Sequence, residues 1–515
     1  MSLFDQGWRA AALFTHITSL PSPYGVGDLG PCAHAFLDFL KRSGFHFWQV
    51  LPVNPTAPGL GNSPYSAYSA FAGFELLVSP DLMVKDGWLS PDQARDARLP
   101  NTGQVDFPKA MEVKTKLIDA AYSKVGFGIL DRKDFAKFIY DNAAWLNDYA
   151  FFMAVKADFG GSSWSHWPDG LKYRDDRELA HHGRRLSEAI LRIKFGQYLF
   201  FKQLGILKDQ AKARGLGLIG DIAFYVNHDS SDVWSNRRLF KLNNDGSTSF
   251  MAGVPPDYYS ETGQLWGNPV FDWASHQADG FGWWKSRIFH LLGLFDWVRL
   301  DHFRAFLAYW EVEPGSKTAA TGAWQPSPGP ALFESAASSH KSLNIIAEDL
   351  GVITPDVTAL RRRFNFPGMR VLQFGFGSDQ PLSSHTPFRI EPDNLVFSAT
   401  HDNNTSKGWY EEELDADGQK RLSDIAGMEV TAQTAAWALI RFAYLSTGAL
   451  SVVSIPDILN RGSKWRLNLP GTSTGNWGWR LESFDELTSE LSDRLADLGA
   501  VSGRDNLMHP NILTY

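Results

Sequence analysis

The sequence of 515 residues contains a single cysteine, Cys32, which excludes a disulfide within the chain and a cysteine-cluster zinc site. It also lacks any hydrophobic run that approaches the ~18 residues of a membrane-spanning helix. Asp5 and Arg9 lie where a signal peptide would have its apolar segment. These absences predict a cytoplasmic protein that has no membrane partner.

An excess of positive charge is missing as well. Lys and Arg number 49 against 57 Asp and Glu, which gives a net charge of −8, whereas nucleic-acid binding normally requires a clustered basic face. We therefore expect no nucleic-acid partner. Metal-binding spacings such as His-x-His and His-Glu-x-x-His are absent, and the oxygen-rich stretch 227–232 does not fit an EF-hand loop. We also expect no catalytic metal.

Three glycine motifs match signatures of other enzymes but stand in the wrong context. The Gly-x-Gly-x-x-Gly at 215–220 leads into a predicted strand, the reverse of the order in a dinucleotide site. In the same motif at 25–30, two prolines separate the glycines from the preceding strand. The Gly-x-Ser-x-Gly at 471–475 follows Pro470 in a predicted loop instead of a strand-to-helix turn. We expect no cofactor.

Aromatic residues, in contrast, are abundant, at 14% of a chain that is otherwise ordinary for a globular protein, with 44% hydrophobic and 21% charged residues. Some of the 19 tryptophans lie in polar surroundings, as in the segment 473–480. Flat aromatic rings can contact the apolar faces of sugar rings, and they also fill cores. Composition alone leaves both explanations open.

Short apolar runs with the length of buried strands alternate along the chain with segments of helical periodicity. The helical segments include 33–40 and 186–214. The strand candidates are 11–14, 47–51, 217–222, 297–301, 344–349, 370–374, 395–398 and 449–453. This alternation predicts the α/β class and a (β/α)8, or TIM, barrel.

The spacing of these strands is uneven. We expect one elaborated catalytic domain over 1–515, with a helix-rich insertion at about 55–183 after the second strand. A second insertion, at about 227–282, carries the turn-rich loop 253–269. Because long loops in compact domains are usually functional, this loop is predicted to be a lid.

Acidic residues follow several of the strand candidates, where a barrel has its active site. They are Asp221, Asp301, Glu348, Asp349 and Asp402, the last preceded by His401. Each could instead cap a helix or form a structural ion pair. Arg299, on the same side of its strand as Asp301, would hold Asp301 ionised, whereas Glu348 follows an apolar run that favours a protonated acid. Such a pair suits glycosidic bond chemistry.

Motifs spread over nearly the whole chain resemble the 4-α-glucanotransferases of the amylomaltase type, glycoside hydrolase family 77 of the α-amylase clan. The catalytic-type segments are 299–304, 347–351 and 400–403. The other matching segments are 18–30, 48–52, 63–65, 69–73, 220–221, 229–234, 253–269, 468–472 and 475–477. Ala223, Leu265 and the segment 454–465 depart from the family pattern and leave the preferred substrate length open.

The resemblance implies roles for individual residues. Asp301 would be the nucleophile, Glu348 the acid/base, and Asp402 a third carboxylate that binds and distorts the sugar. The implied substrate-binding residues are Tyr65, Asp221, Tyr258, Tyr259, Gln264, Trp266, Arg299, His302, His401 and Asn468. The family also has no C-terminal β-sandwich, which agrees with a chain that stops soon after its eighth strand candidate.

The implied reaction transfers part of an α-1,4-glucan to the 4-hydroxyl of an acceptor glucan or glucose, by retaining double displacement through a covalent glycosyl-aspartate. The expected partners are maltooligosaccharides, amylose and glucose, and the expected assembly is a monomer or a weak homo-oligomer. An α-amylase-type hydrolase, a nonenzymatic glucan-binding module and a metal-dependent sugar isomerase are the alternatives.

Overall fold

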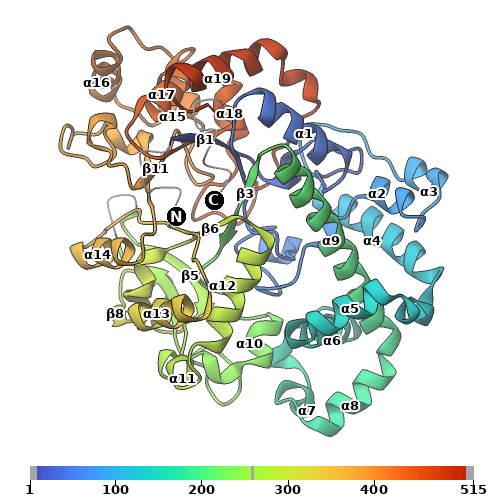
Figure 1. The fold of residues 1–515 in the computed structure, drawn as a ribbon. Coiled ribbons are helices and arrows are strands. Elements are labelled where there is room, and N and C mark those ends of the chain that lie inside the picture. Colours follow the sequence, from blue (N-terminus) through green and yellow to red (C-terminus); the bar gives the residue numbers. More distant parts are fainter. Residues whose placement is uncertain (1–8, 257–259, 506–515) are drawn as a thin grey trace.

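The computed structural model describes residues 9–256 and 260–505, and eight parallel strands form its centre (Figure 1). Their order around the sheet is β10 (Gly368–Val371), β11 (Asn394–Phe397), β12 (Leu450–Ser454), β1 (Ala10–Phe14), β2 (Phe47–Gln49), β3 (Gly217–Ile222), β6 (Trp297–Leu300) and β9 (Ile345–Ala347). The amide of Ala347 in β9 donates to the carbonyl of Pro367, just before β10, at 2.9 Å and so joins the two ends. The predicted (β/α)8 barrel is confirmed.

Each of the eight predicted apolar runs overlaps one barrel strand. The strands are buried almost throughout, as in β1, where all five residues are buried. Parallel strands are covered on both faces, so they appear in a sequence as continuous apolar runs. The predicted and observed ends differ by at most three residues, because strand pairing stops where the chain turns towards a loop.

Helices surround the barrel (Figure 1). The principal ones are α1 (Pro31–Arg42), α9 (Ser187–Ala213), α12 (Gly282–Leu294), α13 (Gly329–Ser339), α14 (Pro355–Arg363), α15 (Ser406–Glu412), α16 (Ala416–Ala426), α17 (Ala435–Leu445), α18 (Ile455–Ile458) and α19 (Ser489–Val501). The apolar stripe of the predicted helix at 33–40 is buried in α1. Helix α9 agrees closely with the predicted 186–214.

Between β2 and β3 the chain forms seven further helices, which lie along the right-hand side of Figure 1. They are α2 (Pro80–Lys85), α3 (Pro91–Asp96), α4 (Phe107–Ser123), α5 (Lys133–Asp141), α6 (Ala143–Asp158), α7 (Asp169–Lys172) and α8 (Asp176–Arg185). Lys156 of α6 forms a 2.5 Å ion pair with Asp229 in the loop after β3. This contact fastens the helical segment to a loop at the carboxyl end of the barrel.

A four-stranded antiparallel sheet, which the sequence did not predict, lies beside the barrel. Its order is β5 (Gln264–Pro269), β4 (Met251–Val254), β7 (Ala308–Val312) and β8 (Ala323–Pro326). Strands β4 and β5 belong to the predicted lid loop, but β4 also pairs with β7, far away in sequence. Strands that are partly exposed and pair with distant segments show little regular hydrophobic pattern, so the sequence gives little sign of them.

After β12 the described chain continues to Asp505 through short helices, turns and α19, without a further strand. No helix in the two described ranges is long and apolar enough to cross a membrane.

Arg504 is completely buried at the amino-terminal end of the barrel. Its guanidinium donates to the carbonyl oxygens of Ala10 at 2.8 Å, Gly448 at 2.7 Å and Ala449 at 3.0 Å, and also to those of Tyr444 and Ser446. It thus connects the first strand, the last strand and α17. Without it, all five carbonyls would lose a charged donor, although those of Tyr444, Ser446 and Ala449 also accept hydrogen bonds from Arg9 or from the amide of Ala10.

The substitution Arg504→Met is expected to lower the free energy of unfolding by at least about 3 kcal/mol, because it removes several hydrogen bonds from a charged donor to buried carbonyls, each worth about 1.5–3 kcal/mol. Arg177→Met, at an exposed position of α8, is the matched control and should change it by less than about 0.5 kcal/mol. Urea unfolding measures both. Equal stabilities for the two variants would contradict this role of Arg504.

Candidate active site

Arg299 forms the centre of the charged cluster at the carboxyl ends of the strands. It lies on β6 directly opposite Asp221 of β3, so the two side chains leave their strands on the same side. Its Nη1 donates to both carboxylate oxygens of Asp221, at 2.8 and 3.0 Å, and its Nη2 donates to Oδ1 of Asp301 at 2.8 Å. Burial raises the pKa of Asp221, and the charge of Arg299 opposes that rise.

Glu348 follows the neighbouring strand, β9. Its carboxyl oxygens accept the backbone amides of His302 at 2.7 Å and Leu350 at 3.0 Å. Burial, together with the nearby charge of Asp301, raises the pKa of Glu348 to about 8, although Arg299 and the two amides act in the opposite direction. Glu348 therefore holds a proton at neutral pH, as a general acid requires.

Asp402 lies after β11, and its side chain is 47% exposed, against 30% for that of Asp301. Its Oδ1 accepts Nδ2 of Asn468 at 2.7 Å, and its Oδ2 lies 3.3 Å from Nε2 of His401. Burial lowers the pKa of His401, so this imidazole is neutral at neutral pH. The arrangement presents an accessible carboxylate beside a neutral hydrogen-bonding ring.

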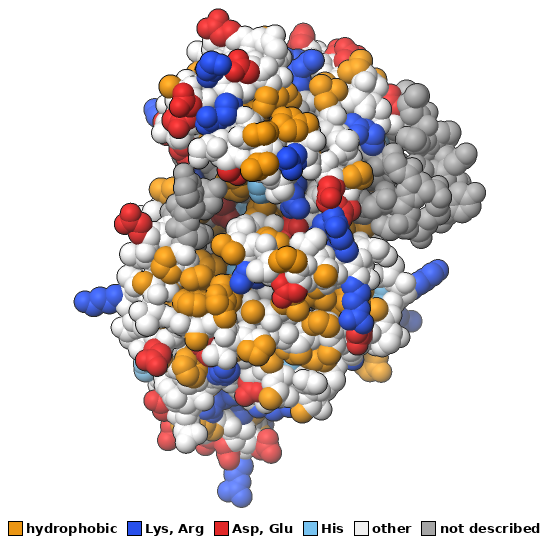
Figure 2. Space-filling model, turned by 90° about the vertical axis from the view of Figure 1, so that its left-hand side faces the viewer, with side chains coloured by type: hydrophobic (Ala, Val, Ile, Leu, Met, Phe, Trp, Pro, Cys, Tyr) orange, Lys and Arg blue, Asp and Glu red, His pale blue; other side chains and the backbone are white. Residues whose placement is uncertain are grey.

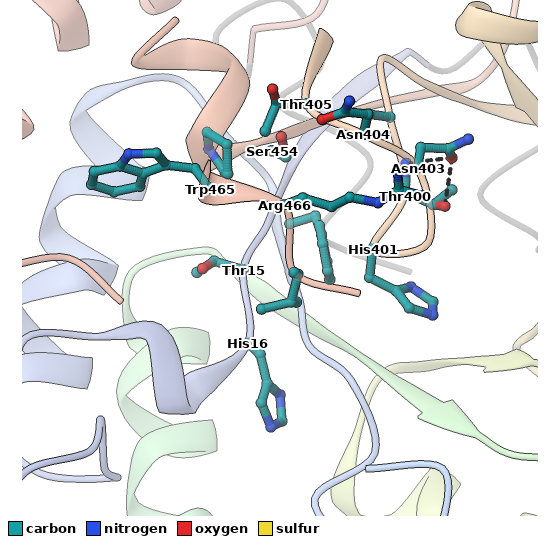
Figure 3. Close-up of a pocket in the computed structure, with 14 residues that line it drawn as sticks. Thr15, His16, Thr400, His401, Asn403, Asn404, Thr405, Ser454, Trp465 and Arg466 are labelled. Carbon is teal, nitrogen blue, oxygen red and sulfur yellow. Dashed lines mark hydrogen bonds between the residues drawn. The ribbon is translucent and has the colours of Figure 1, made fainter. Parts of the chain in front are cut away.

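Tyr65 connects the Arg299 cluster with the Asp402 group. Its hydroxyl donates to Oδ2 of Asp221 at 2.7 Å, and its ring is stacked on His401 with 5.1 Å between centroids. A pocket adjoins this group, and its lining includes His16, Thr400, His401, Trp465 and Arg466 (Figure 3). The fold thus places Tyr65 in contact with both Asp221 and His401, all three of which were predicted site residues.

His302 and Trp266 lie on the Glu348 side of Asp301. His302 adopts a left-handed backbone conformation, with φ of 50°, which is uncommon outside glycine and is often found at functional sites. The ring of Trp266 meets the His302 imidazole edge to face at 5.0 Å, and its Nε1 donates to Oε1 of Gln264 at 3.2 Å. Tyr258 and Tyr259, also predicted for this side, lie outside the described residues.

Three residues that were not predicted as site residues support the Asp402 group. The Nη2 of Arg466 donates to the carbonyl of Asp402 at 2.7 Å, Trp477 lies 6.0 Å from His401 between ring centroids, and His16 lines the adjoining pocket. Trp477 belongs to the segment 475–477 that resembles the family, which is the signal that could have identified it. His16 and Arg466 carry no local signal, because only the barrel closure brings them near Asp402.

A barrel mouth that gathers carboxyl groups around one arginine, with a buried glutamate beside an ion-paired aspartate, is typical of enzymes that act on glycosidic bonds. The family model for 4-α-glucanotransferases, glycoside hydrolase family 77, matches residues 15–487. The chain belongs to this family, as the sequence motifs indicated, and it is an enzyme of the 4-α-glucanotransferase type.

Individual members of the family match this chain over all or nearly all of their lengths. A 4-α-glucanotransferase of Synechocystis sp. is 42% identical, with 96% of this chain and 98% of that protein covered. One of Aquifex aeolicus is also 42% identical, covering 92% of this chain and 96% of the relative. The solved amylomaltase of Streptococcus agalactiae in complex with acarbose has a TM-score of 0.92 at 33% identity, covering 97% of this chain and 100% of that one.

The substitution Arg299→Met should lower the free energy of unfolding by about 3–5 kcal/mol, because it leaves the buried Asp221 without its cation. Adding Asp221→Asn should restore part of that loss, since a neutral amide needs no counter-ion. Denaturant unfolding of both variants at neutral pH provides the measurement. A double variant no more stable than Arg299→Met alone would show that the ion pair is not what Arg299 contributes.

Proposed function

We propose that the protein rearranges α-1,4-glucans by retaining double displacement, with Asp301 as nucleophile and Glu348 as acid/base. The observation that carries the proposal is the contrast between these two neighbours. Asp301 is ion-paired with Arg299, whereas burial keeps Glu348 protonated at neutral pH. Retaining transfer of a glycosyl group requires a carboxylate nucleophile beside a protonated acid.

In the first step, Glu348 gives its proton to the glycosidic oxygen while Asp301 attacks the anomeric carbon. The bond to the leaving glucan breaks as the bond to Asp301 forms. Oδ1 of Asp301 accepts the hydrogen bond from Arg299, so Oδ2 is the oxygen available for attack. The product is a covalent glycosyl-aspartate, and the leaving glucan departs with the proton of Glu348.

In the second step, the now ionised Glu348 takes the proton from the 4-hydroxyl of an acceptor, either a glucan or glucose. The acceptor oxygen attacks the anomeric carbon and releases Asp301, with net retention of configuration. One glycosidic bond replaces another, so the reaction needs no cofactor to supply energy.

The remaining site residues bind and position the sugar. Asp402, with Asn468 and His401 held against it, would accept hydroxyl groups of the sugar that is cleaved. Tyr65 and Asp221 support this subsite through Arg299. On the other side, Trp266 and Gln264 of the lid would occupy the acceptor groove and exclude water, together with Tyr258 and Tyr259.

The reaction itself is tested by incubation with maltotriose. The wild-type protein should produce glucose and a ladder of longer and shorter maltooligosaccharides, with no net rise in reducing ends. Asp301→Asn and Glu348→Gln should each lower the rate by at least about 100-fold, in keeping with the loss of nucleophilic or acid–base catalysis. Glu334→Gln, an exposed carboxylate of α13, is the control and should retain wild-type activity.

A net rise in reducing ends with only short products would identify the protein as an α-amylase-type hydrolase and contradict the proposed water exclusion. Full activity in Asp301→Asn would overturn the nucleophile assignment.

The catalytic activity should decrease at alkaline pH. Because the acid form of Glu348 is required in the first step and its pKa is raised to about 8, kcat/KM should decline as the pH rises through about 8. A pH profile of kcat/KM with maltotriose tests this. An alkaline limb that stays flat to pH 10 would mean that Glu348 is not the proton donor.

A further inference from the structure

Two tryptophans project from one face of the antiparallel sheet beside the barrel mouth. Trp310 of β7 and Trp324 of β8 are direct cross-strand partners, so their side chains share a face. Their rings meet edge to face at an interplanar angle of 66°, with 5.3 Å between centroids. Trp324 lies on an edge strand and is 37% exposed, which is unusual for so large an apolar side chain.

An arginine from the segment that follows β6 contacts the indole of Trp324. The guanidinium of Arg304, in the short helix Phe303–Phe306 directly after Asp301 and His302, lies 3.9 Å from the centroid of the Trp324 ring. Arg304 also donates to the carbonyl of Val352. Arg304 and Trp310 thus hold the ring in place, while 37% of the Trp324 side chain remains exposed.

The contacts of Trp324 place it on the Glu348 side of the site. Arg304 follows Asp301, and Val352 follows Glu348, so both anchors belong to the loops of the nucleophile and the acid/base. Asp402 and Asn468 come from loops after β11 and β12 instead. Because Glu348 protonates the departing oxygen, the departing or incoming glucan lies on the Glu348 side. Figure 2, which views the molecule from the side on which β8 and α14 lie in Figure 1, shows hydrophobic side chains gathered on this face.

We propose that Trp324 is a stacking subsite for the acceptor glucan, at a distance from the reacting glucose unit that only longer acceptors reach. The occupant is an α-1,4-linked glucan chain, because an exposed, rigid indole offers a flat apolar face that matches the C–H faces of sugar rings. The inference rests on the proposed transfer reaction and adds a determinant of acceptor length. Trp266 contacts the ring of His302, the residue directly after Asp301, whereas Trp324 contacts Arg304, three residues after Asp301.

The test measures transfer from unlabelled amylose to acceptors of different length. Glucose, maltotriose and maltoheptaose, each labelled in the reducing-end glucose, are supplied to the wild-type protein and to Trp324→Ala, Trp324→Phe and Trp324→Gln. Tyr173→Ala is the matched control, because the ring of Tyr173 is also exposed and lies 4.7 Å under a guanidinium, that of Arg237.

For Trp324→Ala, kcat/KM with maltoheptaose should fall about three- to tenfold, the effect of one lost aromatic contact, while the value for glucose changes by less than about twofold. Trp324→Phe should lie between Trp324→Ala and wild type, and Tyr173→Ala should match wild type at every length. If thermal unfolding shows that Trp324→Ala does not fold, Trp324→Gln supplies the same comparison.

Equal losses with all three acceptors, or no loss with maltoheptaose, would overturn the subsite. Failure of the wild-type protein to extend any labelled acceptor would instead contradict the proposed function. The two results are distinguishable in the same experiment.

Discussion

The arrangement of the barrel mouth depends on the two-sided ion pair of Arg299. One guanidinium neutralises the buried Asp221 with Nη1 and holds Asp301 with Nη2. Without that cation, two carboxylates and Glu348 would meet in a region of low dielectric, where like charges repel strongly. The register between β3 and β6 places Asp221 opposite Arg299, so the barrel itself determines the charge pattern.

The same cluster gives the two carboxyl groups different surroundings. Asp301 has a cation at hydrogen-bonding distance, whereas Glu348 has only backbone amides, which do not offset its burial. His302 lies beside both carboxyl groups, because it directly follows Asp301 and contacts Glu348. Its strained backbone directs an amide at Glu348, and its ring meets Trp266 of the lid. Asp301, Glu348 and the loop 253–269 are therefore linked through one residue.

The barrel and its acidic residues were predictable because both follow from local patterns. Buried parallel strands read as apolar runs, and residues just beyond their ends must share one rim. The antiparallel sheet was not predictable, since β4 finds its partners in β5 and in the distant β7. For the same reason Arg466 and His16 gave no signal as part of the mouth. Their neighbours are defined by closure of the barrel and not by spacing along the chain.

The proposed covalent intermediate, a glycosyl-enzyme on Asp301, can be tested directly. A glucosyl fluoride donor needs little acid assistance, and in Glu348→Gln no base remains to activate the acceptor, so the intermediate should accumulate. Mass spectrometry of the digested protein should find the peptide that contains Asp301 heavier by the transferred sugar. An unmodified Asp301 peptide despite fluoride release, or the sugar on another residue, would contradict the mechanism.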